Sequence, residues 1–318
     1  MGRENNKIIC RIYSKISKAI DVTAKGGAYG AGIGSGYDTH CQAKQPMCTI
    51  NITDSVINAT GGQYAAGVGT GYHNAALNGE IKNSTENAIL DGSGATATGN
   101  LITAGSNSGI VLNEGAVLQN NNGAHAISLG TRIDATLTIN GGEIINNSSD
   151  SGAIWGGGNI TMNAGKISNN YSTGIGGAIR LTDHTSMTIT GGKISGNTQS
   201  GDSNAFNTWN NTISITAGEL EDNMSYVGGL SLTIGEAEID GVIAYDLSTN
   251  HNTAYLAAKF NSFKFTVDET NENFAYFNFK PDEGYVYVDG DEEKLICMNE
   301  GYETYWDETS RTFKLQAK

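Results

Sequence analysis

Short runs in which apolar residues alternate with Thr, Ser or Asn recur through the middle of the chain. Examples are LTI from Leu137 and ISI from Ile213. Alternation with a period of two predicts a β-strand that buries one face. Most of these runs end in a Gly-Gly or Ala-Gly pair, which lets the chain bend before the next inward Ile or Leu. The pattern therefore predicts pairs of short strands that meet at a corner.

These runs belong to one repeated unit, T-I-x-G-G-x-I-x-x-N. The copies LTINGGEIINN, ITMNAGKISNN, MTITGGKISGN and ISITAGELEDN start at Leu137, Ile160, Met187 and Ile213. Their spacings of 23, 27 and 26 residues fit one coil of a β-helix. Leucine-rich, ankyrin, tetratricopeptide and propeller repeats would each need a signature that is missing here. We therefore predict an all-β fold, a right-handed parallel β-helix solenoid.

A longer repeat lies nearer the N-terminus. GGAYGAGIGSGY at 26–37 returns as GGQYAAGVGTGY at 61–72, an offset of 35 residues. At this offset Val22 falls opposite Ile57, as expected for strands on successive coils. Two tyrosine pairs should also stack between these coils, namely Tyr29 with Tyr64 and Tyr37 with Tyr72.

The N-terminal end of the solenoid is predicted to be irregular. At the 35-residue offset, Ile50 and Ile52 fall opposite polar residues, so the first coil should be incomplete. Apolar residues within 7–20 follow a helical spacing, which predicts an amphipathic cap helix within residues 1–20. A ragged strand is the alternative. Some cap is expected because the end of a solenoid otherwise exposes strand edges.

Composition changes near residue 255. Seven of the eight phenylalanines and only three glycines lie beyond it. We therefore divide the chain into an N-terminal cap at 1–20, a parallel β-helix at 21–254 and an aromatic-rich, acidic β cap or small β module at 255–318. Alternation predicts strands at Phe263–Val267 and 285–288, and Asp289-Gly290 predicts a hairpin turn.

An asparagine ends most copies of the repeated unit. A buried asparagine can stack its amide on the coil above, and an asparagine at a turn can adopt the left-handed conformation. We therefore interpret these residues as structural: Asn147, Asn170, Asn197 and Asn223.

The charge balance limits the partners. The chain has 19 Lys and Arg against 33 Asp and Glu, a formal net charge of −14. A strongly acidic protein does not track a phosphate backbone, so nucleic acid is not an expected partner. No run of 18 or more apolar residues exists, so no segment is expected to span a membrane.

The cysteines and the first residues bear on localisation. MGRENNKIICRIYSK lacks the apolar stretch of a secretion signal, so the chain is either cytoplasmic or a piece of a longer exported protein, and we favour the second. In an exported protein Cys41 and Cys48 are the expected disulfide partners. Cys10 and Cys297 lie near opposite ends of the chain, too far apart for a disulfide in an elongated solenoid.

Gly176-Gly177-Ala178-Ile179 and the looser Gly152-Ala153-Ile154 lie beside xxN segments such as ISNN. This combination resembles the GGAI and xxN repeats of polymorphic outer-membrane proteins and autotransporter-like adhesins. Together with GAGIGSG, it is also similar to Gly-rich β-helix surface proteins of gut bacteria. The resemblance covers roughly residues 20–250. It implies an extracellular or cell-surface binding or adhesive role, with glycans or other cell-surface molecules as partners.

The pectin-lyase-like β-helix also hosts polysaccharide lyases and glycoside hydrolases, so catalysis must be weighed. Glycoside hydrolysis needs two carboxyl groups close together, and acids are sparse in the central coils. Asp183 and His184, with Asp150, are the only catalytic candidates, and a polar turn explains the first pair equally well. The N-T-D, D-D and G-H-G signatures of polygalacturonases are missing. Scattered histidines predict no metal site, and no motif predicts a cofactor.

Large aromatic rings favour binding. Trp155, Tyr171 and Trp209 interrupt coils whose other side chains are small. Aromatic rings stack on sugar faces, so we expect a ligand surface on the lateral face of the coils near these residues. The sequence thus favours a monomeric binding module without catalytic activity, for which carbohydrate is one ligand class. A polysaccharide-degrading enzyme and a passive stalk are the alternatives.

Overall fold

The computed structural model describes six long stretches and a series of short strands before them. The long stretches are 109–130, 135–182, 184–201, 204–227, 231–246 and 254–318. The strand segments described before residue 109 are 12–17, 22–25, 33–34, 48–53, 56–60, 67–69, 81–86, 89–91 and 102–103. The structure is described for these residues only.

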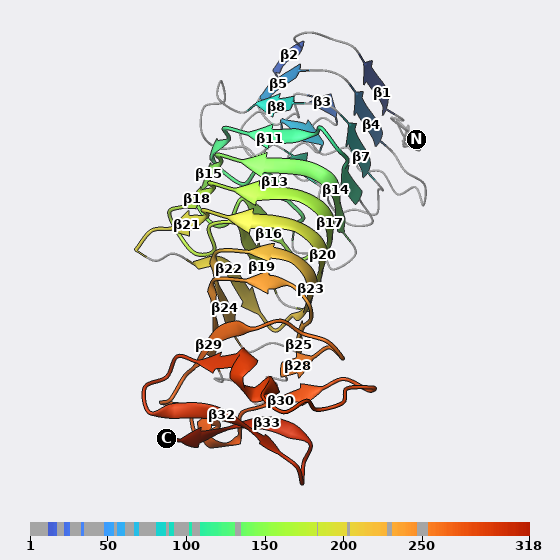
Figure 1. Ribbon diagram of the computed structural model, residues 1–318. Helices are drawn as coiled ribbons and strands as arrows, with labels where there is room; N and C mark the ends of the chain where they lie inside the picture. The colour runs from blue at the N-terminus through green and yellow to red at the C-terminus, as the bar shows by residue number, and fades with distance from the viewer. Residues whose placement is uncertain are drawn as a thin grey trace, which may run out of the picture.

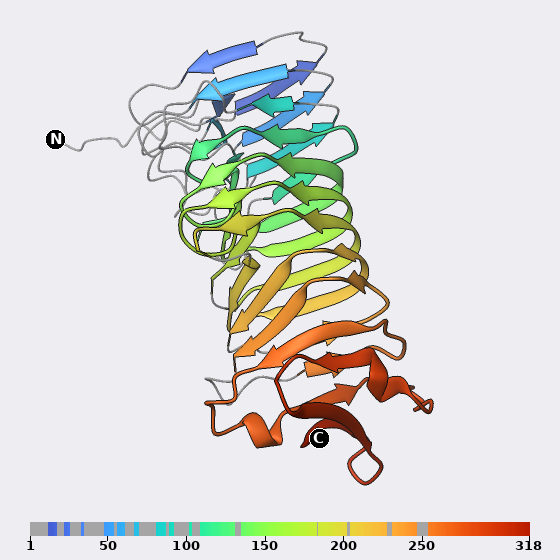
Figure 2. The ribbon, with the colours of Figure 1, turned by 60° about the vertical axis from the view of Figure 1, so that its left-hand side comes forward.

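Within these segments the chain forms a parallel β-solenoid. Its coils stack along one axis, and the first strands and the last strands lie at opposite ends (Figures 1 and 2). The described pairings among strands β1 to β31 are parallel, and the two antiparallel pairings both involve the last strand, β33. The predicted all-β parallel solenoid is therefore confirmed.

The described strands form three sheets that run along the solenoid. Sheet A has 18 strands: β1 (Ile12–Ser17), β2 (Val22–Lys25), β4 (Cys48–Thr53), β5 (Val56–Thr60), β7 (Ile81–Glu86), β8 (Ile89–Asp91), β10 (Gly109–Leu112), β11 (Val117–Gln119), β14 (Thr136–Ile145), β17 (Asn159–Ser168), β20 (Ser186–Ser195), β23 (Thr212–Leu220), β25 (Ser231–Ile234), β26 (Glu238–Ile239), β28 (Ala254–Leu256), β30 (Asn278–Pro281), β32 (Tyr302–Asp307) and β33 (Thr312–Ala317).

Sheet B has 11 strands and sheet C has four. Sheet B comprises β3 (Ile33–Gly34), β6 (Val68–Gly69), β9 (Ile102–Thr103), β13 (Ile127–Ser128), β16 (Ile154–Gly156), β19 (Ile179–Leu181), β22 (Asn204–Trp209), β24 (Asn223–Val227), β27 (Val242–Asp246), β29 (Phe263–Val267) and β31 (Leu295–Cys297). Sheet C comprises β12 (Asn122–Gly123), β15 (Ser148–Ser149), β18 (Tyr171–Ser172) and β21 (Thr198–Gln199). Two short 3-10 helices are η2 (Phe274–Tyr276) and η3 (Asp291–Lys294).

Inward residues of successive coils align in columns and form one continuous core. One such column is in register from β10 to β30, and each member has at most 2% of its surface exposed: Ile110, Leu137, Ile160, Met187, Ile213, Leu232, Ala254 and Phe279. These are the apolar positions of the repeated unit. Burying them removes apolar surface from water along the whole stack, which is the main force that holds the coils together.

The N-terminal predictions need two corrections. Residues 12–17 form strand β1 and not a helix, because their backbone pairs in parallel with β4. β1 aligns Ile16 with Ile52, an offset of 36 residues, whereas β2 aligns Val22 with Ile57 at the predicted 35. The first coil therefore has a complete strand here, and the extra residue lies in the connection between β1 and β2. The four stacked tyrosines predicted nearby lie outside the described residues.

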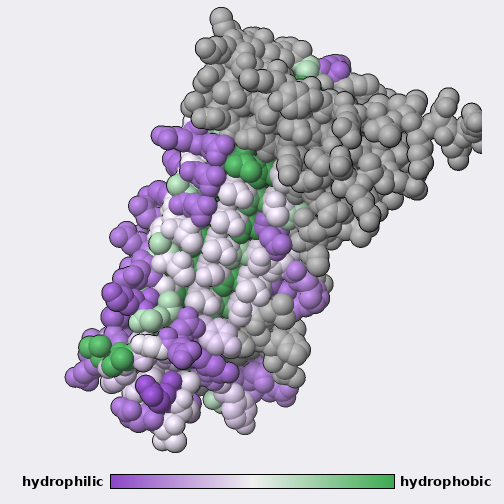
Figure 3. Space-filling view, turned by 90° about the vertical axis from the view of Figure 1, so that its right-hand side faces the viewer, coloured by the Kyte–Doolittle hydropathy of each residue, from purple (hydrophilic) through white to green (hydrophobic). Residues whose placement is uncertain are grey.

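The outer face of sheet A has two halves of different character. Before the glycine bend, one outward column consists of the hydroxyl residues Thr138, Thr161, Thr188, Ser214 and Thr233. After the bend, the outward column is charged: Glu143, Lys166, Lys193, Glu219 and Glu238. Figure 3 shows the first half as pale rows of side chains, with strongly hydrophilic side chains along the left border.

A ladder of buried amide side chains joins the coils at the corner after sheet A. The Nδ2 group of Asn147 donates to Oδ1 of Asn170 at 2.9 Å, and that of Asn170 donates to Oδ1 of Asn197 at 2.8 Å. The predicted structural role of these asparagines is confirmed. The left-handed residue is the one before each of them, as at Asn146 and Asn169, with φ near 55°.

The ladder ends at an aspartate instead of at Asn223. Oδ2 of Asp222 accepts from Nδ2 of Asn197 at 2.8 Å. Asn223 is the first residue of β24, where its Oδ1 accepts from the backbone N–H of Val242 at 2.9 Å. The last member of a ladder only has to accept hydrogen bonds, which a carboxylate does as well as an amide.

The parallel stack continues past the composition change near residue 255. β28 pairs with β30, and β29 pairs with β31, both in parallel. The core changes from aliphatic to aromatic here, with Tyr245, Phe265, Phe277 and Phe279 in edge-to-face or tilted contact. The antiparallel pair β32–β33 closes the last coil, and β33 also pairs with β30.

One of the two strands predicted in this segment is absent. Phe263–Val267 forms β29 as expected, but 285–288 forms no strand. Its alternation instead reflects an extended stretch in which Tyr285 is buried and Val286 is exposed. Asp289 and Gly290 do make a turn, with Gly290 at a φ of 91°, but this turn leads into helix η3.

Candidate functional site

Trp155 lies on the outer face of sheet B. It is the central residue of β16, and its neighbours Ile154 and Gly156 are buried, so the strand alternation turns the indole outward. The indole stacks on the imidazole of His125, with ring centroids 5.2 Å apart and planes 8° apart. In register, Trp155 lies between Ser128 of β13 and Arg180 of β19. It is therefore a half-buried surface ring and not part of the core.

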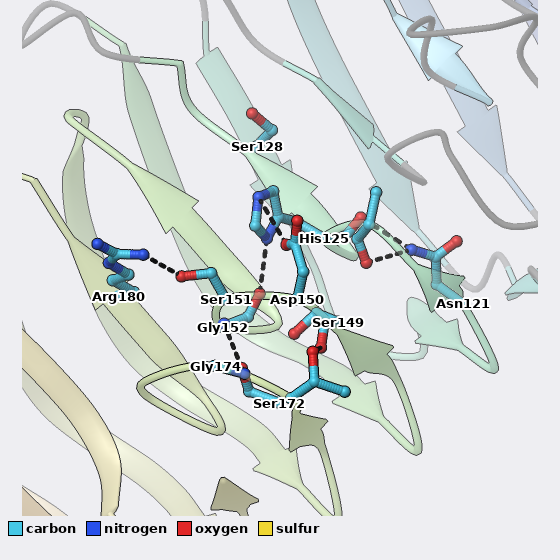
Figure 4. Close-up of polar contacts among 12 residues, drawn as sticks. Asn121, His125, Ser128, Ser149, Asp150, Ser151, Gly152, Ser172, Gly174 and Arg180 are labelled. Atoms are coloured by element: carbon cyan, nitrogen blue, oxygen red, sulfur yellow. Dashed lines mark hydrogen bonds and ion pairs between the residues drawn. The ribbon is translucent and has the colours of Figure 1, made fainter. Parts of the chain in front are cut away.

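His125 is held between two successive coils. Its Nδ1 lies 2.9 Å from the carbonyl oxygen of Gly152, which assigns the proton of the neutral ring to Nδ1. Its Nε2 lies 3.7 Å from Oδ1 of Asp150 (Figure 4). The imidazole side chain is 12% exposed and the Asp150 side chain is 70% exposed. The histidine is thus fixed in place, while the carboxylate remains open to a ligand.

The environment keeps His125 neutral at pH 7. Burial is the largest influence and lowers the pKa of His125 below its ordinary value, because the charged ring loses hydration. The positive charge of Arg180 lowers the pKa further, whereas the hydrogen bond to Gly152 and the negative charge of Asp150 oppose these effects.

Arg180 completes the cluster. It is the central residue of β19, where Ile179 and Leu181 are buried, so its side chain also faces outward. Its Nη1 donates a hydrogen bond to Oγ of Ser151 in the preceding coil (Figure 4). We call His125, Asp150, Ser151, Trp155 and Arg180 the Trp155 cluster. The cluster combines a partly exposed aromatic face with one cation and one anion.

The other predicted site residues lie elsewhere. Tyr171 is 40% exposed but belongs to β18 of sheet C, so it does not share a sheet with Trp155. Trp209 is the last residue of β22, and its side chain lies outside the described residues, as does the whole of Asp183. His184 lies at an exposed turn with a φ of 62°, and its backbone N–H donates to the carbonyl oxygen of Asn210 at 3.1 Å.

The structure thus brings Asp150 and Trp155 together and joins them to a histidine that the sequence did not single out. His125 precedes Gly152 by 27 residues, about one coil. The coil period was therefore the only signal that could have linked His125 to this site. Without the register between coils, that signal cannot be separated from a chance spacing.

Two acidic places on the central coils lack the arrangement that hydrolysis needs. Glu219 and Glu221 lie near each other on the outer face of sheet A, but Nζ of Lys193 bridges both, at 2.9 Å from Oε2 of Glu219. In the Trp155 cluster, Asp150 has an imidazole and not a second carboxyl group beside it. Among the described residues no group of three or more His, Cys, Asp or Glu side chains could hold a metal ion.

The class defined by this fold and site is a parallel β-solenoid with an aromatic and charged cluster on its lateral face. Comparison with protein-family models, with curated proteins and with solved structures found no match to the chain. Neither of the two helices in the described residues has the length or the apolar character needed to cross a membrane.

Proposed function

We propose that this chain is an extracellular or cell-surface binding module that recognises carbohydrate through the Trp155 cluster. The observation that carries the proposal is the partly exposed Trp155 ring, stacked on His125 and flanked by Arg180 and Asp150. An indole face covers the C–H face of a sugar, while an arginine donates to sugar hydroxyls and a carboxylate accepts from them.

The cluster is organised before any ligand arrives. The imidazole supports Trp155 from one side, and Ser151 holds the guanidinium of Arg180. Both strands lie in a continuous parallel sheet, so their backbones are rigid as well. A site with fixed side chains loses less conformational entropy when it binds, which raises affinity for a small ligand.

Binding is favoured over hydrolysis because glycoside hydrolysis uses a pair of carboxyl groups and the Trp155 cluster has one. The two-carboxylate mechanism needs groups about 5–10 Å apart, one on each side of the scissile bond. In the Trp155 cluster only Asp150 supplies a carboxylate. The nearby His125 side chain is largely buried, with 12% of its surface exposed.

A glycan array tests the proposal, followed by calorimetry with the strongest neutral oligosaccharide found. Trp155→Ala and Arg180→Ala should each weaken binding about tenfold, the scale of one aromatic contact or one charge-assisted hydrogen bond. Tyr171→Ala is the matched control, because it removes an exposed ring from a different sheet. Its affinity should stay within about twofold of the parent, and circular dichroism should show each variant folded.

Three results would overturn the proposal. Equal losses in Trp155→Ala and Tyr171→Ala would show that the cluster is not the site. Sugar release by the parent that disappears in Asp150→Asn would instead identify a polysaccharide-degrading enzyme. A folded parent that binds no glycan on the array would favour a passive stalk.

A further inference from the structure

A concave surface lies in the C-terminal cap, away from the Trp155 cluster. It is a pocket of about 830 Å³ between helix η2, strand β30 and the β32–β33 hairpin. Its walls carry two tyrosines, Tyr276 and Tyr305, and three cations, Lys280, Arg311 and Lys314. No aspartate or glutamate lines it.

This concentration of positive charge runs against the surrounding sequence. Residues 268–308 contain 13 Asp and Glu against two Lys, in a chain whose formal net charge is −14. None of these acids lines the pocket, and the acid at its edge, Asp307, pairs with Lys314. Asp291, for example, is buried, where it accepts from the Tyr285 hydroxyl and pairs with Lys294. A cationic pocket in an acidic protein attracts anions locally, although the net charge of the protein repels them.

The cations are held by the hairpin. Lys314 pairs with the Asp307 carboxylate, and Asn278 of β30 lies opposite Lys314 in the antiparallel pair. Arg311 lies in the turn, where its N–H donates to the carbonyl oxygen of Asp307 at 2.7 Å. Its φ of 53° is left-handed, a conformation that favours glycine. The chain therefore keeps an arginine at a position where glycine would cost less energy.

We propose that this pocket binds an acidic saccharide, that is, a sugar chain that carries carboxylate or sulfate groups. The guanidinium fork of Arg311 fits a carboxylate or sulfate with two parallel hydrogen bonds, and Lys280 adds a point charge, whereas the charge of Lys314 is paired with Asp307. Tyr276, which is 79% exposed at the pocket, offers a ring face for the sugar. The hydroxyls of Ser310 and Thr312 and the amide of Asn278 can bind neutral hydroxyl groups.

The volume argues for a saccharide over a simple anion. A pocket of about 830 Å³ lies in the range of sites for small organic ligands and far exceeds one sulfate or phosphate. The proposal goes beyond the lateral carbohydrate site, because it concerns a different surface and a charged ligand. It stands whether or not the Trp155 cluster binds sugar.

Calorimetry with the full chain tests the proposal with four probes: trigalacturonate, a sulfated disaccharide, maltotriose as a neutral sugar, and inorganic sulfate. Trigalacturonate or the sulfated disaccharide should bind, and maltotriose should bind at least about tenfold more weakly at this pocket. Affinity for the acidic sugar should fall as salt is raised, because exposed charges are screened.

Arg311→Gly is the sharpest variant, since it removes the charge and suits the left-handed backbone, so the fold should be retained. It should weaken binding of the acidic sugar about tenfold, and Lys280→Gln should weaken it severalfold. Lys264→Gln is the matched control, an exposed cation on β29 outside the pocket, and it should leave the affinity unchanged.

Trp155→Ala separates the two sites, because it should leave binding of the acidic sugar intact. Unchanged affinity in Arg311→Gly would overturn the pocket proposal. Equal affinity of the Trp155→Ala variant for maltotriose and for the acidic sugar would overturn the requirement for an acidic group. If inorganic sulfate binds as tightly as the acidic oligosaccharides, the pocket is a simple anion site and the saccharide proposal is wrong.

Discussion

Asn170 shows at the scale of one residue why an asparagine recurs at the end of each repeat. Its Oδ1 accepts from the backbone N–H of Asn147 at 3.0 Å and from the Asn147 side chain. Its Nδ2 donates to the carbonyl oxygen of Ile144 at 2.9 Å and to Oδ1 of Asn197. The asparagine side chain is short and its amide group offers two donor and two acceptor sites, which is why this position specifies asparagine.

Asn170→Ala should therefore lower the free energy of unfolding by about 2–4 kcal/mol, because it strands a buried N–H and a buried carbonyl oxygen. Urea unfolding followed by circular dichroism measures this loss. Asn163→Ala is the matched control. Asn163 joins a similar ladder to Asn140, but in an exposed position, so its loss should stay below about 1 kcal/mol. Equal losses would contradict a special role for the buried ladder.

The same ladder supports the Trp155 cluster. Nδ2 of Asn121, one coil before Asn147, donates to the carbonyl oxygens of Ala124 and His125 at 2.9 and 3.0 Å. The backbone N–H of Asn121 in turn donates to Oδ1 of Asn147 at 3.0 Å. The structural ladder thus fixes the turn that carries the imidazole.

His125 makes stability depend on pH. Because its pKa is lowered in the folded protein, the unfolded chain binds the proton more tightly. The contribution of His125 to stability is full above the ordinary pKa of about 6.5 and is lost as pH falls through the folded pKa. The free energy of unfolding should therefore decrease as pH falls below about 6.5.

The His125→Gln variant should lack this part of the pH dependence when both proteins are unfolded in urea at several pH values. The pair Asp307–Lys314 is a second source of pH dependence, since Lys314 lowers the pKa of Asp307 to about 2. Its contribution is present above pH 3.8 and disappears only as pH falls towards 2, whereas that of His125 starts to disappear near pH 6.5. Identical slopes for parent and variant between pH 5 and 7 would contradict this assignment.

At the scale of one element, the bend in each sheet A strand depends on glycine. Gly165, in β17, has a φ of 96°, and a Cβ atom there would lie 2.2 Å from the carbonyl oxygen of Gly142 in the preceding coil. A Cβ atom at Gly192 would lie 2.9 Å from the carbonyl oxygen of Gly165, and one at Gly218 would lie 2.8 Å from that of Gly192. The bends stack glycine on glycine, which explains the G-G and A-G pairs of the repeat.

Gly165→Ala should cost about 3 kcal/mol or more in the free energy of unfolding, because two backbones would have to separate. Gly201→Ala provides the control. Gly201 has a similar φ of 81° but nothing within 4 Å of the added Cβ, so only the backbone penalty of about 1–2 kcal/mol applies. Thermal or urea unfolding of both variants separates the cost of the backbone contact from the cost of the left-handed conformation. A loss at Gly165 no larger than that at Gly201 would contradict the close stacking of the bends.

At the scale of the whole molecule, stability is distributed along the stack. Each coil contacts only its neighbours, so a solenoid behaves as a chain of coupled units. The aromatic C-terminal cap closes the apolar column at one end. Phe313 lies at its centre, fully buried, with its ring centroid 4.8 Å from that of Trp306 and 6.0 Å from that of Tyr285.

Phe313→Ala should remove about 3–5 kcal/mol from the cap while the central coils keep their packing. Hydrogen exchange detected by mass spectrometry should show lost protection in β30 to β33 and unchanged protection in β14 to β20. Val286→Ala, which changes a 75% exposed residue in the same cap, should leave both regions protected. Uniform loss of protection over all coils would indicate a single cooperative unit and contradict this view.

Much of the fold could be predicted because its signals are local and repeat. Alternation in LTI and ISI places Leu137, Ile139, Ile213 and Ile215 inward, and the structure buries all four. The start-to-start spacing of the units sets the coil length, and stacked coils must bring like positions together. The N-terminal strand was harder to predict, because one additional residue between β1 and β2 moves the register from 35 to 36.

The sequence by itself determined the parallel solenoid, its inward columns, its glycine bends and the role of its asparagines, since each follows from a short pattern that recurs once per coil. Only the tertiary structure decided which polar groups meet. His125, Asp150 and Arg180 gather around Trp155 because coil length and register place residues of successive coils side by side. Lys280, Arg311 and Lys314 share a pocket because the last hairpin folds back onto β30. Such meetings depend on contacts between segments distant in sequence, which no local pattern encodes.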